Sequence, residues 1–149
     1  MIRNATLQDV PALVALGWLM HEESVYAPYS YDPEKVSKMI EALITTRFGI
    51  ALVAEQDGAV IGGFIGTVVE HWFGSDTVAS DLALFIDPVY RAGRTGLKLI
   101  KRYIETATEK GASQIMLANS TGYKSDRVAR LFEAMGFKRN GYVFEYANA

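Results

Sequence analysis

Apolar residues recur along the first half of this chain with the period of a helix. Residues 7–22 and 33–48 carry apolar side chains three and four positions apart, the spacing that places them on one helical face. Thr6 is a plausible cap for the first of these segments, and Asp32 followed by Pro33 is a favourable start for the second. The pattern therefore predicts two amphipathic helices.

Strand patterns occupy the rest of the first half. Residues 50–55 and 60–70 are rich in β-branched and other apolar residues. They are separated by Gln56, Asp57 and Gly58, which are typical of a hairpin turn. Residues 2–5 predict one more short strand. We expect these strands to form an antiparallel meander.

Strands and helices alternate more regularly in the second half of the chain. The expected elements are a strand at 78–86, a helix at 95–110, a strand at 114–118, a helix at 126–135 and a final strand at 141–146. This order after a meander predicts an α/β (α+β) protein, in which helices flank both faces of a mixed, mostly antiparallel central sheet.

Composition narrows the class of protein. The chain has 149 residues, of which 50% are hydrophobic and 21% charged, so we expect one globular domain over residues 1–149. The absence of cysteine excludes disulfides, thiolate metal sites and a cysteine nucleophile. We find no convincing signal peptide and no run of eighteen apolar residues, so the expected location is cytoplasmic, without membrane association. A net charge of −2 gives no basic field for nucleic acid.

A strand passes directly into a helix through a short Gly-containing turn at residues 84–100. Such a turn directs free backbone N–H groups and the positive end of the helix dipole at one point, which suits a phosphate or pyrophosphate. Gly93 and Gly96 could equally serve only a tight turn and close packing. Neither GxxxxGK[ST] nor GxGxxG is present, so the usual nucleotide fingerprints do not apply.

Two short motifs carry more information together than either does alone. The first comprises Ile86, Pro88 and Tyr90 at the strand end, with Arg91 and Gly96 in the following turn. The second is RLFEAMGF at residues 130–137. They resemble the V-x-P-x-Y/F strand end with its Q/R-x-x-G-x-G/A loop, and the L-Y-E-K-x-G-F signature, of the GCN5-related N-acetyltransferase (GNAT) family. The resemblance covers essentially the whole chain.

The resemblance implies a GNAT-like fold that uses acetyl-CoA as cosubstrate and no metal. Backbone amides of the loop would hold the CoA pyrophosphate, and the end of the preceding strand would pair with the pantetheine arm. A polar contact near the cofactor would come from Ser125 or Asn119. The implied cofactor-binding residues are Leu84, Phe85, Ile86, Arg91, Ala92, Gly93, Arg94, Thr95, Gly96, Asn119, Ser125 and Phe132.

The sequence departs from the family pattern at two positions. Arg94 stands where the family has the first loop glycine, and Gly93 could supply the flexibility instead. Phe132 stands where the family has its usual general acid, a tyrosine, and a phenyl ring cannot donate a proton. A thiolate is a tolerable leaving group without protonation. Otherwise Tyr123, Tyr142 or Tyr146 could substitute as the acid.

An amine acceptor must be neutral when it attacks, which calls for a nearby base. The candidates on strands next to the cofactor are Glu70, His71 and Asp81. The segment between the first two helices commonly shapes the acceptor pocket in the family, and its carboxylates and aromatic rings would suit a cationic amine. The candidate acceptor-binding residues there are Glu22, Glu23, Tyr26 and Tyr29, with Tyr31 nearby.

We therefore predict an N-acetyltransferase that passes an acetyl group directly from acetyl-CoA to a primary amine in a ternary complex. Without a protein thiol, a cysteine-linked acetyl-enzyme is impossible. The alternative is a non-catalytic acyl-CoA-binding module, which the departures at Arg94 and Phe132 favour. A nucleic-acid-binding domain has only the basic stretch at residues 98–102 in its favour. The acceptor would be a small-molecule or peptide amine, and the apolar segment 142–146 could pair across a homodimer.

Overall fold

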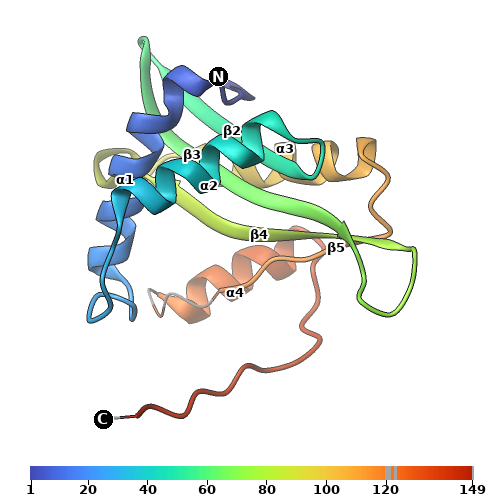
Figure 1. Ribbon diagram of the computed structural model, residues 1–149. Helices are drawn as coiled ribbons and strands as arrows, with labels where there is room; N and C mark the ends of the chain where they lie inside the picture. The colour runs from blue at the N-terminus through green and yellow to red at the C-terminus, as the bar shows by residue number, and fades with distance from the viewer. Residues whose placement is uncertain (120–121, 123, 149) are drawn as a thin grey trace.

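A single five-stranded sheet organises the computed structural model, which describes residues 1–119, 122 and 124–148. The strands lie in the order β1-β2-β3-β4-β5 (Figure 1). The first four pair antiparallel, and β5 pairs parallel to β4. Their bounds are β1 (Ile2–Asn4), β2 (Gly49–Gln56), β3 (Ala59–Glu70), β4 (Thr77–Ile86) and β5 (Gln114–Ile115).

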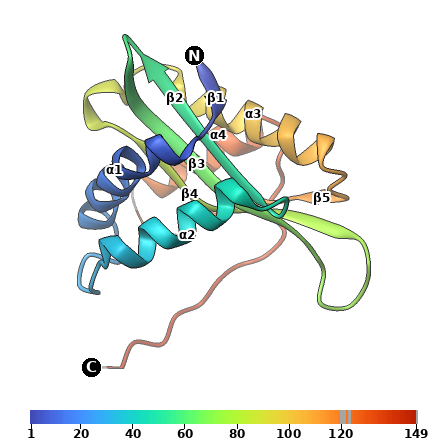
Figure 2. The same ribbon diagram turned by 45° about the horizontal axis from the view of Figure 1, so that its top comes forward.

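Helices cover both faces of this sheet. Helices α1 and α2 cover one face, and α3 covers the other, as Figure 2 shows. Helix α4 follows β5 and runs below β4 in the view of Figure 1. The helical bounds are α1 (Val10–Glu23), α2 (Pro33–Thr45), α3 (Thr95–Glu109) and α4 (Ser125–Ala134), with 3-10 turns η1 (Leu7–Asp9) and η2 (Pro88–Tyr90). The expected fold class is confirmed.

Alternate residues of the central strands supply two hydrophobic cores. On β2, Leu52 faces α3 and Val53 faces α1 and α2, because successive side chains of a strand point to opposite faces. The core under α3 is centred on Phe64 and Tyr103, whose rings stack with centroids 4.2 Å apart. Both side chains have no exposed surface.

Local signals in the sequence account for most element boundaries. The Asp32 carboxylate accepts hydrogen bonds from the backbone N–H groups of Glu34 and Lys35, and so caps α2. Asp57 and Gly58 have φ values of 52° and 79°, the left-handed conformation of the tight hairpin between β2 and β3. The first helix differs in detail from the prediction, since η1 precedes α1.

Two strand predictions need correction. The strand expected at residues 114–118 pairs as a strand over Gln114–Ile115 alone, because the chain then turns away from β4. The strand expected at 141–146 is wrong for the structure described, in which residues 137–148 have no strand conformation. That segment runs away from the sheet (Figures 1 and 2), so no neighbouring strand completes a ladder with it.

A glycine on β3 sets the distance between the sheet and α1. A β-carbon at Gly63 would overlap the Leu13 side chain, which is completely buried, and would lie 3.1 Å from the Leu52 carbonyl oxygen. A close approach of helix and strand therefore requires glycine at this position. By contrast, a β-carbon at Gly74, in the β3–β4 connection, would meet nothing within 4 Å.

We predict that Gly63→Ala lowers the free energy of unfolding by about 1–3 kcal/mol, because the added methyl group overpacks the α1 interface. Urea titration followed by circular dichroism measures this change. Gly74→Ala is the matched control and should stay within about 0.5 kcal/mol of the wild type. Equal stability of the two variants would contradict the proposed close packing at Gly63.

Candidate active site

Strands β4 and β5 separate soon after they pair. Their register pairs Val78 with Gln114 and Ala79 with Ile115. The Met116 N–H still donates to the Ala79 carbonyl oxygen at 2.8 Å. From there to its end at Ile86, β4 has no paired β5 residue within the described chain. The edge of β4 is therefore open over most of its second half.

Two side chains hold β5 where it leaves β4. The Ala118 N–H donates to Asp81 Oδ1 at 3.0 Å, so a side chain on β4 takes the place of a backbone partner. The Tyr103 hydroxyl of α3 donates to the Met116 carbonyl oxygen at 2.7 Å. Burial, together with the nearby charge of Asp81, raises the pKa of Tyr103, so the phenol stays protonated and keeps this bond.

Asp81 is half-buried at the point where the two strands part. Burial raises the pKa of its carboxyl group, and the hydrogen bond from Ala118 opposes that shift only in part. The pairing of β3 with β4 shifts register next to it, so that Leu82 is an extra residue between Asp81 and Ala83. Such bulges redirect side chains, and they are common beside active sites.

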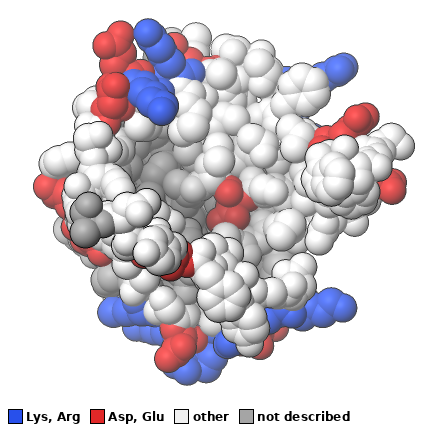
Figure 3. All heavy atoms as spheres, turned by 60° about the horizontal axis from the view of Figure 1, so that its bottom comes forward, with Lys and Arg blue, Asp and Glu red and all other residues white. Residues whose placement is uncertain are grey.

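The face of the molecule below β4 is hollowed, as Figure 3 shows. Uncharged side chains make up most of the surface around this hollow, and acidic atoms lie near its middle. Lys and Arg side chains lie towards the periphery of this view. A positively charged group would therefore be attracted towards the interior of the hollow.

The loop between β4 and α3 leaves several backbone donors without helical partners. The N–H of Lys98 bonds the Arg94 carbonyl oxygen, so the N–H groups of residues 95–97 precede the first helical bond. Arg94 stands at the N-cap and makes no capping bond with its side chain. With the helix dipole, this arrangement suits an anion.

Neither loop glycine adopts a left-handed backbone conformation. Gly93 and Gly96 are both outside the positive-φ region, so neither is required by backbone strain. A β-carbon at Gly96 would meet only the Ile86 side chain, at 3.9 Å. The space above Gly96 is open, and a larger side chain there would occupy it without disturbing the fold.

An ion pair links this loop to the end of α1. Arg91 Nη1 lies 2.6 Å from Glu23 Oε2, and Arg91 Nε donates to the Ile86 carbonyl oxygen at 3.3 Å. The sequence suggested Arg91 for cofactor and Glu23 for acceptor, but no spacing signal could join two residues so far apart in the chain. The structure therefore places Glu23, a candidate acceptor-binding residue, directly against the β4–α3 loop.

The segment between α1 and α2 also contacts the loop before α4. A β-carbon at Gly122, which has a φ of 76°, would overlap the Val25 side chain. Tyr26 and Tyr29 are exposed in this segment, as is Glu22 at the end of α1. Residues 22–31 therefore lie between the cofactor loop and the β5–α4 connection. The Val25 contact had no signal in the sequence.

The rings of Trp18, His21 and Tyr31 pack together beside this segment. Tyr31 donates its hydroxyl to the Val14 carbonyl oxygen at 2.8 Å and packs edge-on to Trp18, with ring centroids 5.5 Å apart. His21 lies 5.3 Å from the Tyr31 ring. Burial raises the pKa of Tyr31, which keeps its hydroxyl protonated. Tyr31 is thus a structural anchor of the acceptor segment.

The remaining cofactor candidates lie around the start of α4. Asn119 donates from Nδ2 to the Ser125 carbonyl oxygen at 3.0 Å, so these two candidates are neighbours. Phe132 is half-buried, and its ring lies 6.2 Å from that of Phe137. Among the tyrosines suggested as acids, Tyr123 lies outside the described residues. Tyr142 and Tyr146 are 82% and 90% exposed on the extended C-terminal segment, away from the sheet.

Two candidate bases lie elsewhere. Glu70 ends β3 opposite Thr77, on the side of the β4–β5 pairing away from the opening, and lines a separate cavity of about 620 Å³ with Phe48 and Lys110. His71 stacks on Phe73 in the following loop, with ring centroids 4.7 Å apart. Of the suggested bases, only Asp81 lies where β4 and β5 separate.

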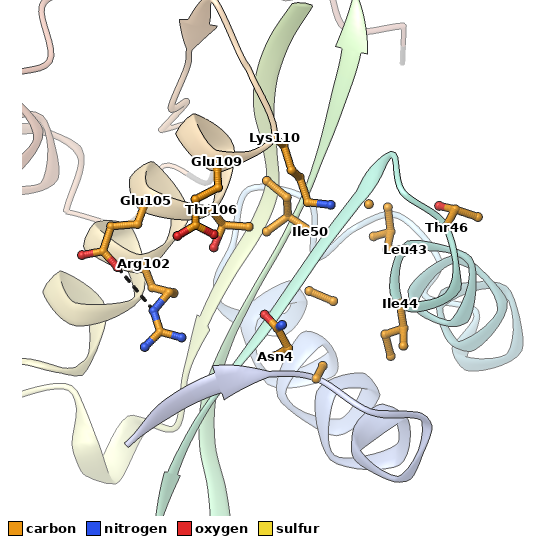
Figure 4. A pocket seen from close by; sticks show the side chains of 13 residues that line it. Asn4, Leu43, Ile44, Thr46, Ile50, Arg102, Glu105, Thr106, Glu109 and Lys110 are labelled. Carbon is orange, nitrogen blue, oxygen red and sulfur yellow. Dashed lines mark ion pairs between the residues drawn. The ribbon is translucent and has the colours of Figure 1, made fainter.

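Another cavity of about 620 Å³ lies away from this opening. It is lined by residues of β1, β2, α2 and α3, with the Arg102–Glu105 ion pair on one wall (Figure 4). No residue of β4 or β5 lines it. Arg102, in the basic stretch at residues 98–102, lines this cavity.

Within the part of the chain that is described, no three acidic or histidine side chains group together as metal ligands would. None of the helices described there combines the length and the apolar character needed to cross a bilayer.

Known structures share this fold. An aminoglycoside acetyltransferase from an uncultured soil metagenomic sample aligns with 100% of this chain and 98% of its own, at a TM-score of 0.74 and 16% identity. Glucosamine-6-phosphate N-acetyltransferase from Arabidopsis thaliana aligns with 99% of this chain and 97% of its own, at a TM-score of 0.75 and 14% identity. A transcriptional regulator from Bacillus halodurans C-125 aligns with 98% of this chain and 99% of its own, at a TM-score of 0.78 and 19% identity.

Comparison of the sequence with known protein families identifies the family of this chain. Residues 17–137 match the acetyltransferase (GNAT) family, so the chain belongs to that family, as the two motifs predicted. No curated protein matches the sequence. Family membership and the shared fold support acetyl transfer as the activity in general terms.

The hydrogen bond from the Ala118 N–H to Asp81 can be tested by amide exchange. Asp81→Ala removes the acceptor of the Ala118 N–H, so this amide should exchange with solvent about ten- to a hundredfold faster, as the loss of a hydrogen bond to a charged group implies. Amide exchange followed by NMR measures it. Asp81→Asn keeps an acceptor oxygen and should retain most of the protection. An unchanged rate in Asp81→Ala would show that the side chain does not hold β5.

Proposed function

We propose that this chain transfers an acetyl group from acetyl-CoA directly to a primary amine. The observation that carries the proposal is Asp81, a half-buried carboxyl group with a raised pKa at the point where β4 leaves β5. A base with a raised pKa takes protons more effectively near neutral pH. Its position places it beside the open edge of β4, where the donor would lie.

The residues around the opening suit CoA. The N–H groups at the start of α3 would bind the pyrophosphate, as helix N-termini bind phosphates in other proteins. The open backbone of residues 84–86 would pair with the amides of the pantetheine arm, as an added strand pairs with a sheet edge. The open space at Gly96 admits a phosphate close to the backbone.

Asp81 then has a defined role. Acetyl-CoA supplies the acetyl group as a thioester, whose C–S bond breaks as the new C–N bond forms. The ionised Asp81 carboxylate accepts the proton that the ammonium must lose, directly or through one water molecule. Backbone N–H groups of β4 that face the opening stabilise the negative charge on the carbonyl oxygen. The sulfur leaves as a thiolate, which requires no acid at the Phe132 position, and the thiolate then takes up, through water, the second proton that the nitrogen loses as the amide forms.

The acceptor that fits best is a small cationic amine. Acidic atoms lie near the middle of the hollow. Glu22, Tyr26 and Tyr29 are exposed at the end of α1 and in the segment that follows it. Carboxylates and aromatic faces both attract an ammonium group. Two proteins of the same fold are named for amino-sugar substrates, an aminoglycoside and glucosamine 6-phosphate. We therefore propose amino sugars as the first acceptors to test.

Asp81→Asn should lower kcat/KM for the amine by about a hundredfold or more, the usual contribution of a general base. Wild-type kcat/KM should fall as the pH drops through the pKa of Asp81, because only the carboxylate accepts a proton. That pKa lies above the ordinary carboxyl value of 3.8, so the acidic limb should lie above it too. The limb should be absent in Asp81→Asn. Glu70→Gln is the control, and a larger loss there than in Asp81→Asn would refute the assignment.

Gly96→Val should weaken acetyl-CoA binding at least tenfold, because the side chain fills the space that the pyrophosphate would occupy. Isothermal titration calorimetry measures the affinity. The melting temperature should stay unchanged, since the new side chain points into open space. Gly74→Val, in another open position, should bind as the wild type does. Unchanged affinity in Gly96→Val would place the cofactor elsewhere.

One observation favours a second function. Phe132 occupies the position of the family's usual acid, and Tyr142 and Tyr146 lie far from the opening. A non-catalytic acyl-CoA-binding module would need no acid. Tight acetyl-CoA binding without release of free thiol on any amine of a broad panel would favour this function over acetyl transfer.

A further inference from the structure

The cavity between α2 and α3 is not used by the proposed acetyl transfer. It has a volume of about 620 Å³, and its lining comes from β1, β2, α2 and α3 (Figure 4). Among the described residues that line it, none belongs to β4 or β5. Small-molecule sites in proteins have volumes of roughly 300–1,000 Å³. The molecule therefore has room for a second ligand away from the opening.

The two walls of this cavity differ in chemistry. Leu43 and Ile44 of α2 form an apolar wall, and the buried Ile50 of β2 adjoins it. The facing wall is a polar side of α3 that carries charges of both signs. Its lining residues are Arg102, Glu105, Thr106, Glu109 and Lys110. A ligand that matches both walls has an apolar body together with a positive and a negative group.

Arg102 is suited to bind the negative group of such a ligand. Its Nε lies 3.5 Å from Glu105 Oε2, and within the described part of the chain its two Nη atoms donate to no acceptor. Two guanidinium N–H groups bind a carboxylate side by side. Asn4, exposed at the end of β1, lies between the two walls in Figure 4 and can donate from its amide to the same carboxylate.

The positive group has two acceptors on the lining. The Ala5 N–H donates to the Ala51 carbonyl oxygen at 2.9 Å. The carbonyl of Gly49 points to the same side of β2, because backbone groups alternate along a strand, and no β1 residue lies opposite it. Glu109 is exposed and makes no ion pair with any described residue. An ammonium group could therefore donate to the Gly49 carbonyl oxygen and to the Glu109 carboxylate.

The walls are fixed without a ligand. A β-carbon at Gly49 would overlap the backbone of Leu43, so the end of α2 packs directly on the start of β2. Lys110 Nζ donates to the Arg47 carbonyl oxygen at 3.1 Å, which links the end of α3 to the turn between α2 and β2. A preformed site binds its ligand at a lower cost in ordering.

We propose that this cavity binds a small zwitterion with an apolar body, which is either an apolar α-amino acid or a short apolar peptide. The ligand carboxylate binds Arg102 and Asn4. The ammonium group binds Glu109 and the Gly49 carbonyl oxygen, and the apolar part packs on Leu43. The site is separate from the opening between β4 and β5 and does not depend on acetyl transfer.

The first test locates the ligand by NMR, with L-leucine titrated into isotopically labelled protein. Backbone amide signals of Ala51 and Thr106, which line the cavity, should shift and saturate. The signals of residues 84–86 report on the opening in the same spectra. The absence of saturable shifts at the cavity amides, whatever happens at residues 84–86, would overturn the proposal.

The same titration distinguishes the two sources of the ligand. Leu-Leu and Leu-Leu-Leu are compared with leucine, and tighter binding of a peptide or of the free amino acid identifies the source and supports the proposal in either case. Glycine has no apolar side chain and should bind about tenfold more weakly than leucine. Equal affinity for glycine and leucine would contradict the role of the apolar wall.

The second test matches each charge of the protein with one charge of the ligand by calorimetry. Arg102→Gln should weaken leucine binding about tenfold, as the loss of a hydrogen bond to a charged group implies. It should leave the affinity for leucinamide, which has no carboxylate, unchanged. Glu109→Gln should likewise weaken leucine binding and leave the affinity for N-acetylleucine, which has no ammonium group, unchanged.

Two control variants remove the same charges outside the cavity. Lys101→Gln lies on α3 and Glu41→Gln on α2, and both side chains are exposed and absent from the lining. Both variants should bind leucine as the wild type does. Losses in these controls equal to those in Arg102→Gln and Glu109→Gln would show an effect of net charge alone and would overturn the proposed site.

Discussion

The separation of β5 from β4 is the constraint on which the rest of this structure depends. If the two strands paired along their full length, the edge of β4 would be filled by backbone and Asp81 would face a neighbouring strand. Instead, pairing ends after Ala79, and two side-chain bonds take over, from Tyr103 to Met116 and from Ala118 to Asp81. The same displacement leaves the far edge of β5 open. The early end of β4–β5 pairing thus accounts both for the opening between the two strands and for the unpaired outer edge of β5.

Two effects act on the protonation of Asp81 in opposite directions. As the acceptor for Ala118 it benefits from being ionised, since a hydrogen bond to a charged group is stronger than a neutral one. Burial favours the neutral form, and the net shift of its pKa is upward. A carboxyl group held between these tendencies is suited to exchange protons.

Much of the fold could be predicted from the sequence because the signals were local. Asp32 with Pro33, and Asp57 with Gly58, mark a helix start and a hairpin through contacts with their own neighbours. The turn from β4 into α3 was also predictable, because a strand end, a turn and a helix start are adjacent in the chain. The Arg91–Glu23 pair and the contact of Val25 with Gly122 were not, since they join residues brought together only by the packing of α1. The segment at 141–146 has a strand pattern, but a strand forms only when an edge lies beside it.

The ion pair between Arg91 and Glu23 couples the β4–α3 loop to the end of α1. Both side chains are partly exposed, at 28% and 37%, so the pair is worth under about 1 kcal/mol and exchanges readily. An anion that competes for Arg91 therefore releases the Glu23 carboxylate from the loop at little cost. A cation that attracts Glu23 weakens the contact of its carboxylate with the guanidinium in the same way. By thermodynamic linkage each event favours the other to the same extent, by no more than the ion pair itself is worth.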